Sequence, residues 1–293
     1  MEKEGNEDRL FKYVKINDHT KDNLINNELF FSHPEDFNDP FDSKIEVEYK
    51  GTIKDWYYWA ASRRKDIDKK DINQMIKDET IIEVGNGIFE INPTKNDKLL
   101  KDVAKNHYKI CSFSETKLSI LMWSHYADSH KGICLCFKTH KVKNHHLLEF
   151  LISESMSMGV STPMLFPVDY HKPKQKKINM LTLPPEENIK LIEFYKRKHR
   201  DWKYEKEHRK IIFDKFGHEK GFTVKYRKED LEGIIFGLKA KRKEIEVIIN
   251  IISSYYLRQG IKVNFYSTHE IQGEFAIEVK KINDISEYLK TLS

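Results

Sequence analysis

The segment from Trp202 to Phe213 constrains the fold of this chain more than any other. It reads W-K-Y-E-K-E-H-R-K-I-I-F, so Glu205 and Glu207 stand two residues apart, just ahead of an apolar run. If the segment is extended, a period of two places both carboxylates on one face and Lys206 on the other. Burial of two carboxylates without partners is costly, which favours a position at the mouth of a cleft. There a carboxylate can stabilise a developing positive charge or orient a hydroxyl group.

An edge strand with solvated charges explains the same run. In that interpretation Glu207 pairs with Arg209 or Lys210 and has no chemical role. Charged residues are common on edge strands, where they discourage pairing with another chain. The rest of the sequence has to decide between the two interpretations.

The composition is that of a folded protein with a well-solvated surface. The chain has 293 residues, of which 39% are hydrophobic, 12% aromatic and 33% charged, so it can bury a substantial core. No apolar run approaches the roughly 20 residues that a membrane helix needs. The N-terminus is acidic and polar, unlike a secretory signal. We expect a cytoplasmic protein that does not bind a membrane.

The cysteines argue against a disulfide framework. Cys111, Cys134 and Cys136 are odd in number and show no pattern of spaced pairs. Zinc sites usually separate paired cysteines by two to four residues, whereas a single residue separates Cys134 from Cys136. We therefore expect buried structural thiols and no metal ligands.

Positive charge is modest in total but clustered. The net charge is +5, and cations gather at 172–177, 196–200 and 239–243. Such clusters can contact phosphates, although a solvated helix face balanced by acidic residues elsewhere is the simpler explanation for any one of them. The cluster nearest the two glutamates supplies the candidate nucleic-acid contacts, which are Lys196, Arg197, Lys198 and Arg200.

The pattern of elements predicts a single catalytic domain over residues 1–293 with an α+β fold. We expect mixed, mainly antiparallel sheets around a cleft, with a helical insertion at about 53–105 and a C-terminal helix–strand extension at about 241–293. Predicted strands cover 10–16, 28–32, 110–113, 133–137, 207–213, 231–236, 261–266 and 275–279. Predicted helices follow Asn17 and cover 119–127, 187–202 and 241–259. No GxGxxG or GxxxxGK[ST] motif indicates a familiar nucleotide site.

Three further segments carry candidate binding residues. In the loop 37–42, Phe37 could stack on a flat ring, and Asn38 and Asp39 could form turns or contact a ligand. Ser112 and Ser114 lie two apart in a predicted strand, so both hydroxyls face one side and could hold a ribose, or pair across strands. A third segment presents the aromatic and polar side chains Trp123, His125 and Tyr126.

Two enzyme classes fit these segments poorly. Ser124, His125 and Asp128 are too close in sequence to converge as nucleophile, base and orienting residue, and no nucleophile elbow is present. A metal-dependent nuclease would need a denser set of carboxylates and histidines than any one segment shows.

Several uncommon motifs occur in order along the chain. They are Phe11-Lys-Tyr13, Leu29-Phe-Phe-Ser-His-Pro34, Phe37-Asn-Asp-Pro-Phe-Asp42 (FNDPFD), Met122-Trp-Ser-His-Tyr-Ala127 (MWSHYA) with Lys131-Gly132, and Trp202-Lys-Tyr-Glu-Lys-Glu207 (W-x-x-E-x-E). Together they resemble a bacterial family of domains of unknown function that occurs in phage-defence and toxin-like settings, and the resemblance spans roughly residues 8–240. One position departs from it, because His208 stands where a tryptophan is expected before Arg209.

The order of the motifs along the chain is also remotely similar to the order of motifs in enzymes with the ADP-ribosyltransferase fold. Those enzymes carry a basic or aromatic residue on the first strand, a Ser-x-Ser-like motif on a central strand and E-x-E at the start of a late strand. Lys12-Tyr13, Ser112-Phe-Ser114 and Glu205-Lys-Glu207 follow that order. The first motif departs from the usual arginine or histidine.

This resemblance implies an NAD-dependent ADP-ribosyltransferase that acts as an intracellular toxin or anti-phage effector. It implies that Glu207 stabilises the oxocarbenium-like transition state and that Glu205 steers or deprotonates the acceptor. NAD, as substrate, would contact Lys12, Tyr13, Phe37, Asn38, Asp39, Ser112, Ser114, Trp123, His125 and Tyr126. The basic clusters favour RNA or DNA as the acceptor, and a toxin would need an antitoxin or chaperone partner.

Two rival functions remain open from the sequence. One is a metal-dependent nuclease that uses the same carboxylates and histidines. The other is a non-enzymatic module of a defence system that binds nucleic acid or protein, in which Glu205 and Glu207 are purely structural. Metal dependence without NAD would identify the first, and a neutral Glu207→Gln variant would favour the second.

Overall fold

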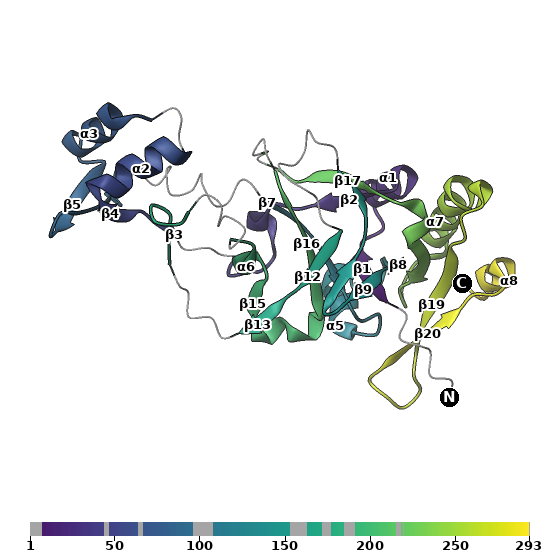
Figure 1. The fold of residues 1–293 in the computed structure, drawn as a ribbon. Helices are drawn as coiled ribbons and strands as arrows, with labels where there is room; N and C mark the ends of the chain where they lie inside the picture. The colour runs from purple at the N-terminus through teal and green to yellow at the C-terminus, as the bar shows by residue number, and fades with distance from the viewer. Residues whose placement is uncertain are drawn as a thin grey trace.

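A ten-stranded mixed sheet forms the centre of the molecule (Figure 1). The computed structural model describes residues 8–43, 47–63, 67–95, 108–152, 163–171, 177–184, 191–214, 218 and 220–292. The strand order is β20-β19-β18-β8-β1-β7-β16-β12-β10-β9. All neighbouring pairs run antiparallel except β18 and β19, which are parallel. Together with its helices, this sheet confirms the predicted α+β class with mainly antiparallel pairing.

Segments far apart in the sequence supply these ten strands. They are β1 (Arg9–Val14), β7 (Tyr108–Ser114), β8 (Ile133–Lys138), β9 (His140–Val142), β10 (His145–Leu147), β12 (Met164–Pro167), β16 (Glu207–Phe213), β18 (Leu231–Phe236), β19 (Asn264–Glu270) and β20 (Ile277–Lys281). Four smaller sheets contain β11 (Phe150–Leu151), β17 (Phe222–Tyr226) and β2 (Glu28–Phe31); β13 (Asp169–His171) and β15 (Arg197–His199); β14 (Ile178–Asn179) and β3 (Val47–Glu48); and β4 (Lys50–Thr52), β6 (Ile88–Ile91) and β5 (Ile81–Gly85).

The helices are short, apart from one near the C-terminus. The α-helices are α1 (Asp18–Asn26), α2 (Ile53–Arg63), α3 (Lys69–Lys77), α5 (Ile120–Tyr126), α6 (Ile192–Tyr195), α7 (Arg242–Tyr255) and α8 (Ile285–Thr291). The 3-10 helices are η1 (Pro34–Asp36), η3 (Arg200–Glu205), η4 (Lys228–Asp230) and η5 (Leu257–Gln259).

Local sequence explains where several of these helices begin and end. The side chain of Asn17 accepts a hydrogen bond from the Thr20 N–H and caps α1, and Asn27 ends that helix in the left-handed conformation at φ 48°. The Ser119 side chain caps α5 in the same way. These caps confirm the helices predicted after Asn17 and over 119–127.

The main core lies on one face of the large sheet. It contains Phe113 and Ile212 from β7 and β16, and α7 covers part of it with Ile245, Ile248 and Ile252. Because side chains alternate along a strand, the residues next to Phe113 in β7 and next to Ile212 in β16 point to the opposite face of the sheet. That opposite face carries the site described below.

The predicted C-terminal extension at 241–293 is built into this sheet. β19 pairs in parallel with β18, and β20 closes the sheet at its edge. The helix predicted over 241–259 is α7 followed by η5.

A small lobe, made of β3–β6, α2 and α3, lies at one end of the molecule, away from the large sheet (Figure 1). It has its own apolar cluster, centred on Trp56 and Trp59. The insertion predicted at about 53–105 is therefore helical only in part, because residues 81–91 form a β-hairpin around Gly85-Asn86-Gly87. Residues 96–107 lie outside the described part of the chain.

The helix predicted over 187–202 is wrong where the structure describes it. α6 lasts only from Ile192 to Tyr195, and β15 and η3 follow directly. β15 pairs in parallel with β13, and this tertiary pairing outweighs the helical periodicity of the segment. Residues 185–190 lie outside the described chain.

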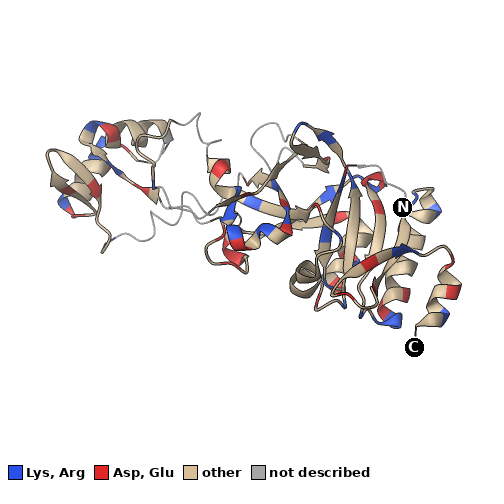
Figure 2. Ribbon diagram, turned by 90° about the horizontal axis from the view of Figure 1, so that it is seen from below, with Lys and Arg blue, Asp and Glu red and all other residues tan. Residues whose placement is uncertain are grey.

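Two properties of the whole chain bear on its partners. Among the described residues, no helix has both the length and the apolarity to cross a membrane. Lys and Arg are interspersed with Asp and Glu over both the large sheet and the small lobe (Figure 2).

Candidate functional site

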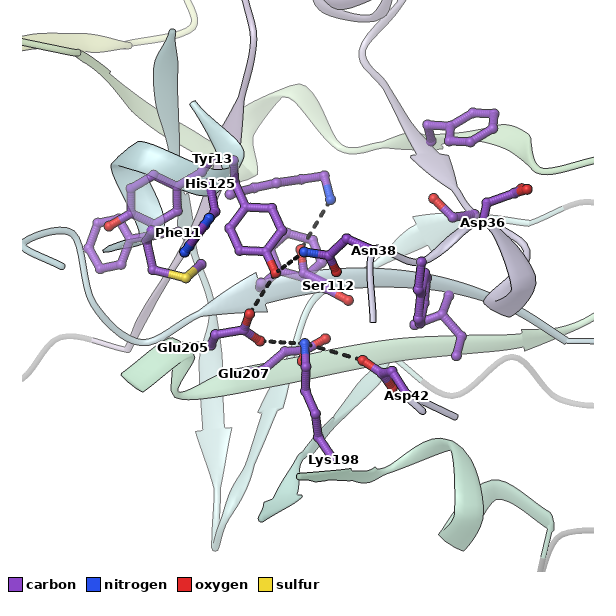
Figure 3. Close-up of a pocket in the computed structure, with 18 residues that line it drawn as sticks. Phe11, Tyr13, Asp36, Asn38, Asp42, Ser112, His125, Lys198, Glu205 and Glu207 are labelled. Atoms are coloured by element: carbon purple, nitrogen blue, oxygen red, sulfur yellow. Dashed lines mark hydrogen bonds and ion pairs between the residues drawn. The ribbon is translucent and has the colours of Figure 1, made fainter. Parts of the chain in front are cut away.

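A pocket of about 330 Å³ opens on the face of the large sheet opposite the main core (Figure 3). Its walls come from β1, β7, the start of β16, α5 and the loop 36–42. We call it the carboxylate pocket, because Asp42, Glu205 and Glu207 all reach it. Its lining residues are Phe11, Lys12, Tyr13, Phe30, Ser32, Asp36, Phe37, Asn38, Asp42, Ile110, Ser112, Phe113, Met122, His125, Tyr126, Lys198, Glu205 and Glu207.

The two glutamates reach the pocket from different elements, so the segment is not extended through both of them and the period of two does not apply. Glu205 ends η3, Lys206 adopts the left-handed conformation at φ 44°, and Glu207 begins β16. The Lys206 carbonyl accepts a hydrogen bond from the N–H of Glu115 at 3.0 Å, which holds this turn against the end of β7. Both carboxylates still face the same pocket.

Glu207 is held by a buried arginine. Arg209 donates from Nε to Oε1 at 2.7 Å and from Nη2 to Oε2 at 2.9 Å, and Lys198 donates to Oε2 at 3.3 Å. Burial opposes ionisation of Glu207, but the charges of Arg209 and Lys198 and a hydrogen bond from Ser112 outweigh it and lower its pKa. β16 lies between β7 and β12, so the pairing of Glu207 with Arg209 occurs inside the sheet and not on an edge strand.

Lys198 and Arg209 link all three carboxylates into one buried cluster. Lys198 Nζ lies 2.6 Å from Glu205 Oε2 and 3.2 Å from Asp42 Oδ2, and Arg209 forms a two-point contact with Asp42 at 2.7 and 2.8 Å. Burial favours the neutral form of Lys198, but Glu207, Asp42 and Glu205 together raise its pKa. Three carboxylates against two cations leave one net negative charge when every group is ionised.

Glu205 is the carboxyl group of this cluster that can bind a proton and so remove the net negative charge. Burial, followed by the nearby charge of Glu207, raises the pKa of Glu205 to about 7. The Tyr126 hydroxyl donates to its Oε1 at 2.6 Å, and Lys198 occupies Oε2. One carboxylate of the pair is therefore firmly ionised, and the other can exchange a proton near neutral pH.

The wall opposite the carboxylates is aromatic. Phe11 and Tyr13 extend from β1, and Tyr126 comes from α5. The Tyr13 hydroxyl donates to the carbonyl of Thr116 at 2.7 Å, and its ring packs edge-on against Trp123, which fixes it in place. Lys12 donates to the carbonyl of Ser112 at 3.1 Å across the β1–β7 pair.

The loop 36–42 closes the remaining side. The ring of Phe37 lies beneath the Arg209 guanidinium, with 5.5 Å between the guanidinium carbon and the ring centroid. The Asn38 side chain donates to the Tyr126 hydroxyl at 3.4 Å, and Asp42 is fixed by Arg209. The sequence suggested turn formation and ligand contact for this loop, and Phe37 and Asn38 both line the pocket.

Three of the predicted NAD contacts do not line the pocket. Ser114 is buried and donates to the backbone carbonyl of Glu205 at 2.6 Å, so it positions the turn. Trp123 is fully buried, and its Nε1 donates to the carbonyl of Lys117. The Asp39 side chain accepts from the Phe41 N–H and borders a separate surface depression beside Trp202.

The predicted basic cluster is not one exposed face. Lys198 is buried among three carboxylates, so we correct its assignment as a nucleic-acid contact to that of a pocket residue. Lys196 pairs with Glu193, and the Arg197 guanidinium stacks on Phe194. Of the four cations, Arg200 has a side chain that is 59% exposed. Residues 172–176 of another basic cluster lie outside the described chain.

Sequence reasoning did not assign Asp42, Lys198 and Arg209 to the site. A signal was present for Arg209, because it stands two residues after Glu207 in a predicted strand and so shares its face. Asp42 is the last residue of the FNDPFD motif, but it stands 167 positions before Arg209 in the sequence, so nothing nearby predicts their contact. The three cysteines are buried and free, in keeping with the expected structural thiols.

Comparison with known proteins adds one family. Residues 122–210 match the model of a family described as "Protein of unknown function (DUF2971)". The matched residues include the MWSHYA motif, Lys198 and both glutamates. They do not include β1 or the loop that contains the FNDPFD motif. No curated protein and no solved structure matches the chain. The part of the site from α5 to Lys210 thus resembles a family whose activity its description leaves open.

Proposed function

We propose that the chain is an NAD-dependent ADP-ribosyltransferase whose substrate binds in the carboxylate pocket. The observation that carries the proposal is the arrangement of the three motif segments. Lys12-Tyr13, Ser112-Phe-Ser114 and Glu207 lie on the adjacent strands β1, β7 and β16, and all of these residues except Ser114 line a single pocket. Segments that are about 100 residues apart in the sequence thus lie side by side in the sheet, and this proximity supports the proposal.

The electrostatics of the pocket suit cleavage of a glycosidic bond. Glycoside hydrolases cleave such bonds through an oxocarbenium-like transition state, which forms between two carboxyl groups whose pKa values differ. Here the pKa of Glu207 is lowered, whereas that of Glu205 is raised to about 7. Loss of nicotinamide from NAD creates positive charge on the ribose, and a fixed anionic cluster stabilises that charge.

The hydrogen bonds distinguish the tasks of the two glutamates. A carboxylate offers about four acceptor positions. Arg209 occupies two on Glu207, and Lys198 and Ser112 add further contacts, so Glu207 has little capacity left. Glu205 accepts only from Tyr126 and Lys198 among the described residues. We therefore assign contact with the ribose hydroxyl or the acceptor to Glu205, and the fixed negative charge to Glu207.

The aromatic wall supports binding of a flat ring. Tyr13 is anchored through Thr116 and Trp123, so Tyr126 and Phe11 are the better stacking partners for nicotinamide. Ser112 lies on the pocket floor, where its hydroxyl can position a ribose. A pocket of about 330 Å³ accommodates the nicotinamide riboside half, and the rest of NAD would extend outward.

The proposed acceptor rests on the basic clusters of the sequence, and the proposed biological role rests on the family resemblance. Nucleic acid, either RNA or DNA, is the proposed acceptor, and toxicity or anti-phage defence is the proposed role, with an antitoxin protein as partner. In the cluster 196–200, Arg200 is the candidate for contact with a phosphate of the acceptor, because its side chain is 59% exposed and lies 3.9 Å from Asp201.

The test is transfer of label from radiolabelled NAD, with RNA, DNA and cell lysate offered as acceptors. Wild type is compared with Glu207→Gln, Glu205→Gln and a matched control, Glu193→Gln, whose carboxylate is on the surface of α6. We expect Glu207→Gln to lower the rate by about 10²–10³, as for loss of one preorganised electrostatic group, and the control to retain it.

Other outcomes point to other functions. Free ADP-ribose without transfer indicates a glycohydrolase. Cleavage of RNA or DNA that requires a divalent ion and no NAD indicates a nuclease. Absence of NAD turnover with every acceptor contradicts the proposal and leaves a binding module.

A further inference from the structure

A second cluster of titratable groups lies on the reverse face of β16, away from the carboxylate pocket. His208 follows Glu207 in the strand, so its side chain points to the opposite side of the sheet. His146 of β10 reaches the same point, with the two imidazole centroids 4.8 Å apart. Glu115, the first residue after β7, completes the group, which we call the Glu-His-His cluster.

The distances within the cluster are close to those within a metal coordination shell. Glu115 Oε1 lies 2.9 Å from His208 Nε2 and 3.8 Å from His146 Nε2. Ligand atoms about 2.0–2.1 Å from a tetrahedral zinc ion are roughly 3.3 Å from one another, which falls between these two values. One potential ligand atom from each residue lies within 4.8 Å of the other two.

The hydrogen bonds of Thr139 fix the tautomer of His146. The Thr139 hydroxyl donates its one proton to the carbonyl of Asp8 at 2.7 Å. Its oxygen also lies 2.7 Å from His146 Nδ1, so Nδ1 must carry the proton of that contact. In the neutral ring Nε2 is then left with a free lone pair that points into the cluster.

No hydrogen bond satisfies that lone pair in the described structure. His146 is only 3% exposed, and its Nε2 is buried without a hydrogen-bond partner. A buried polar atom without a partner costs about 1–3 kcal/mol, so such an atom calls for a ligand. The Thr139 contact is also the type of outer hydrogen bond that orients a metal-binding histidine.

The cluster has a route to solvent through the Glu115 side. A surface cavity of about 430 Å³ is lined by Glu115 and His208 and also by Lys141, Lys203 and Lys206. The Glu115 side chain is 41% exposed, whereas both histidines are buried. An ion held here would have three protein ligands and an open position toward the cavity, where the lysines favour water or an anion as the fourth ligand.

We propose that Glu115, His146 and His208 form a binding site for a divalent first-row transition-metal ion, with zinc as the best match. Imidazole nitrogens with one carboxylate suit zinc and its neighbours, whereas calcium and magnesium prefer oxygen ligands alone. None of the three proposed ligands lines the carboxylate pocket, although Glu207 borders the cavity through which the cluster reaches solvent.

The test is metal binding by the full-length protein after it has been stripped with a chelator. Zinc is titrated calorimetrically, and Co²⁺ is added separately so that its visible absorption reports the coordination geometry. We expect one equivalent of zinc per chain and the intense visible bands of a four- or five-coordinate cobalt site. Thermal unfolding in zinc should shift to a higher temperature than in its absence.

Substitutions of the proposed ligands test whether the zinc ion binds at this cluster. His146→Asn should weaken zinc binding by at least about 100-fold and Glu115→Gln by at least about tenfold, since loss of outer contacts alone costs about 10–100-fold at such sites. The matched control is His145→Asn, on the same strand, whose ring packs against Phe166 and which should bind zinc as wild type does. Glu115→Gln alters a half-exposed residue, so it tests the site even if the His146 variant fails to fold.

Three results would overturn the proposal. The first is less than stoichiometric zinc binding by wild type. The second is an affinity that neither His146→Asn nor Glu115→Gln changes, which would place the metal elsewhere. The third is an octahedral cobalt spectrum without strong visible bands, which would leave the cluster as a hydrogen-bonded Glu–His network.

Discussion

The two faces of β16 differ in how completely their polar groups are paired. On one face, Glu207 and Arg209 complete a network in which three carboxylates and two cations satisfy one another. On the other face, His208 and His146 are buried, and each retains a ring nitrogen without a hydrogen-bond partner. A fully paired buried network holds its members rigidly in place, whereas a buried polar atom without a partner is costly, and this difference motivates the two separate proposals made for the two faces.

The largest expected effect follows from removal of the arginine on the saturated face. Arg209→Met leaves Glu207 and Asp42 buried without their main partner, and loss of one member of a buried ion pair typically costs about 3–5 kcal/mol. We expect a loss of this size in the free energy of unfolding, measured by urea denaturation at pH 7.

The control for this substitution is Arg227→Met, which breaks a solvent-exposed pair with Glu149. Water already solvates both partners there, so the loss should be far smaller. Equal losses for the two variants would contradict the view that the Arg209 network is a buried, interdependent unit.

A smaller effect should appear in the pH dependence of stability. Glu205 has a pKa of about 7 in the folded protein, against an ordinary value of 4.5. The folded state therefore holds a proton that the unfolded state releases between these values, so the contribution of Glu205 to stability falls as pH rises from about 4.5 to 7. The decrease should be on the order of 3 kcal/mol, since the two pKa values differ by about 2.5 and one pKa unit corresponds to 1.36 kcal/mol.

Comparison with Glu205→Gln isolates this contribution. The amide cannot titrate, so the difference in unfolding free energy between wild type and variant should change across this pH window and level off above it. A difference that stays constant from pH 4.5 to 8 would show that Glu205 titrates normally, and the two carboxyl groups would then not be separated in pKa.

Much of the sheet could be predicted from periodicity. The strands at 207–213 and 231–236 have the predicted bounds, and the helix after Asn17 begins at its predicted cap. The hairpin at 81–91 was missed, although its Asn86-Gly87 pair is a common hairpin turn signal. In that segment the surrounding charged residues favoured the helical interpretation.

The site was harder to predict because its partners are distant in the sequence. Nothing near Lys198 indicates that β13 pairs with β15 and carries this lysine to the carboxylates. The left-handed turn at Lys206 is held by the end of β7, a distant segment, so the sequence could not show that the chain turns between Glu205 and Glu207. Glu115, His146 and His208 have no motif spacing, and only the order of the strands brings them together.

The most direct test is a crystal structure with carba-NAD, an analogue in which a dihydroxycyclopentane replaces the ribose next to nicotinamide, so that the bond to nicotinamide is not cleaved. We expect its nicotinamide ring between Tyr126 and Phe11, and a hydroxyl of the adjoining cyclopentane ring within hydrogen-bond distance of Glu205. Calorimetric titration should show one binding site per chain. An analogue bound at another surface, or no binding in the titration, would contradict the assignment of the carboxylate pocket to NAD.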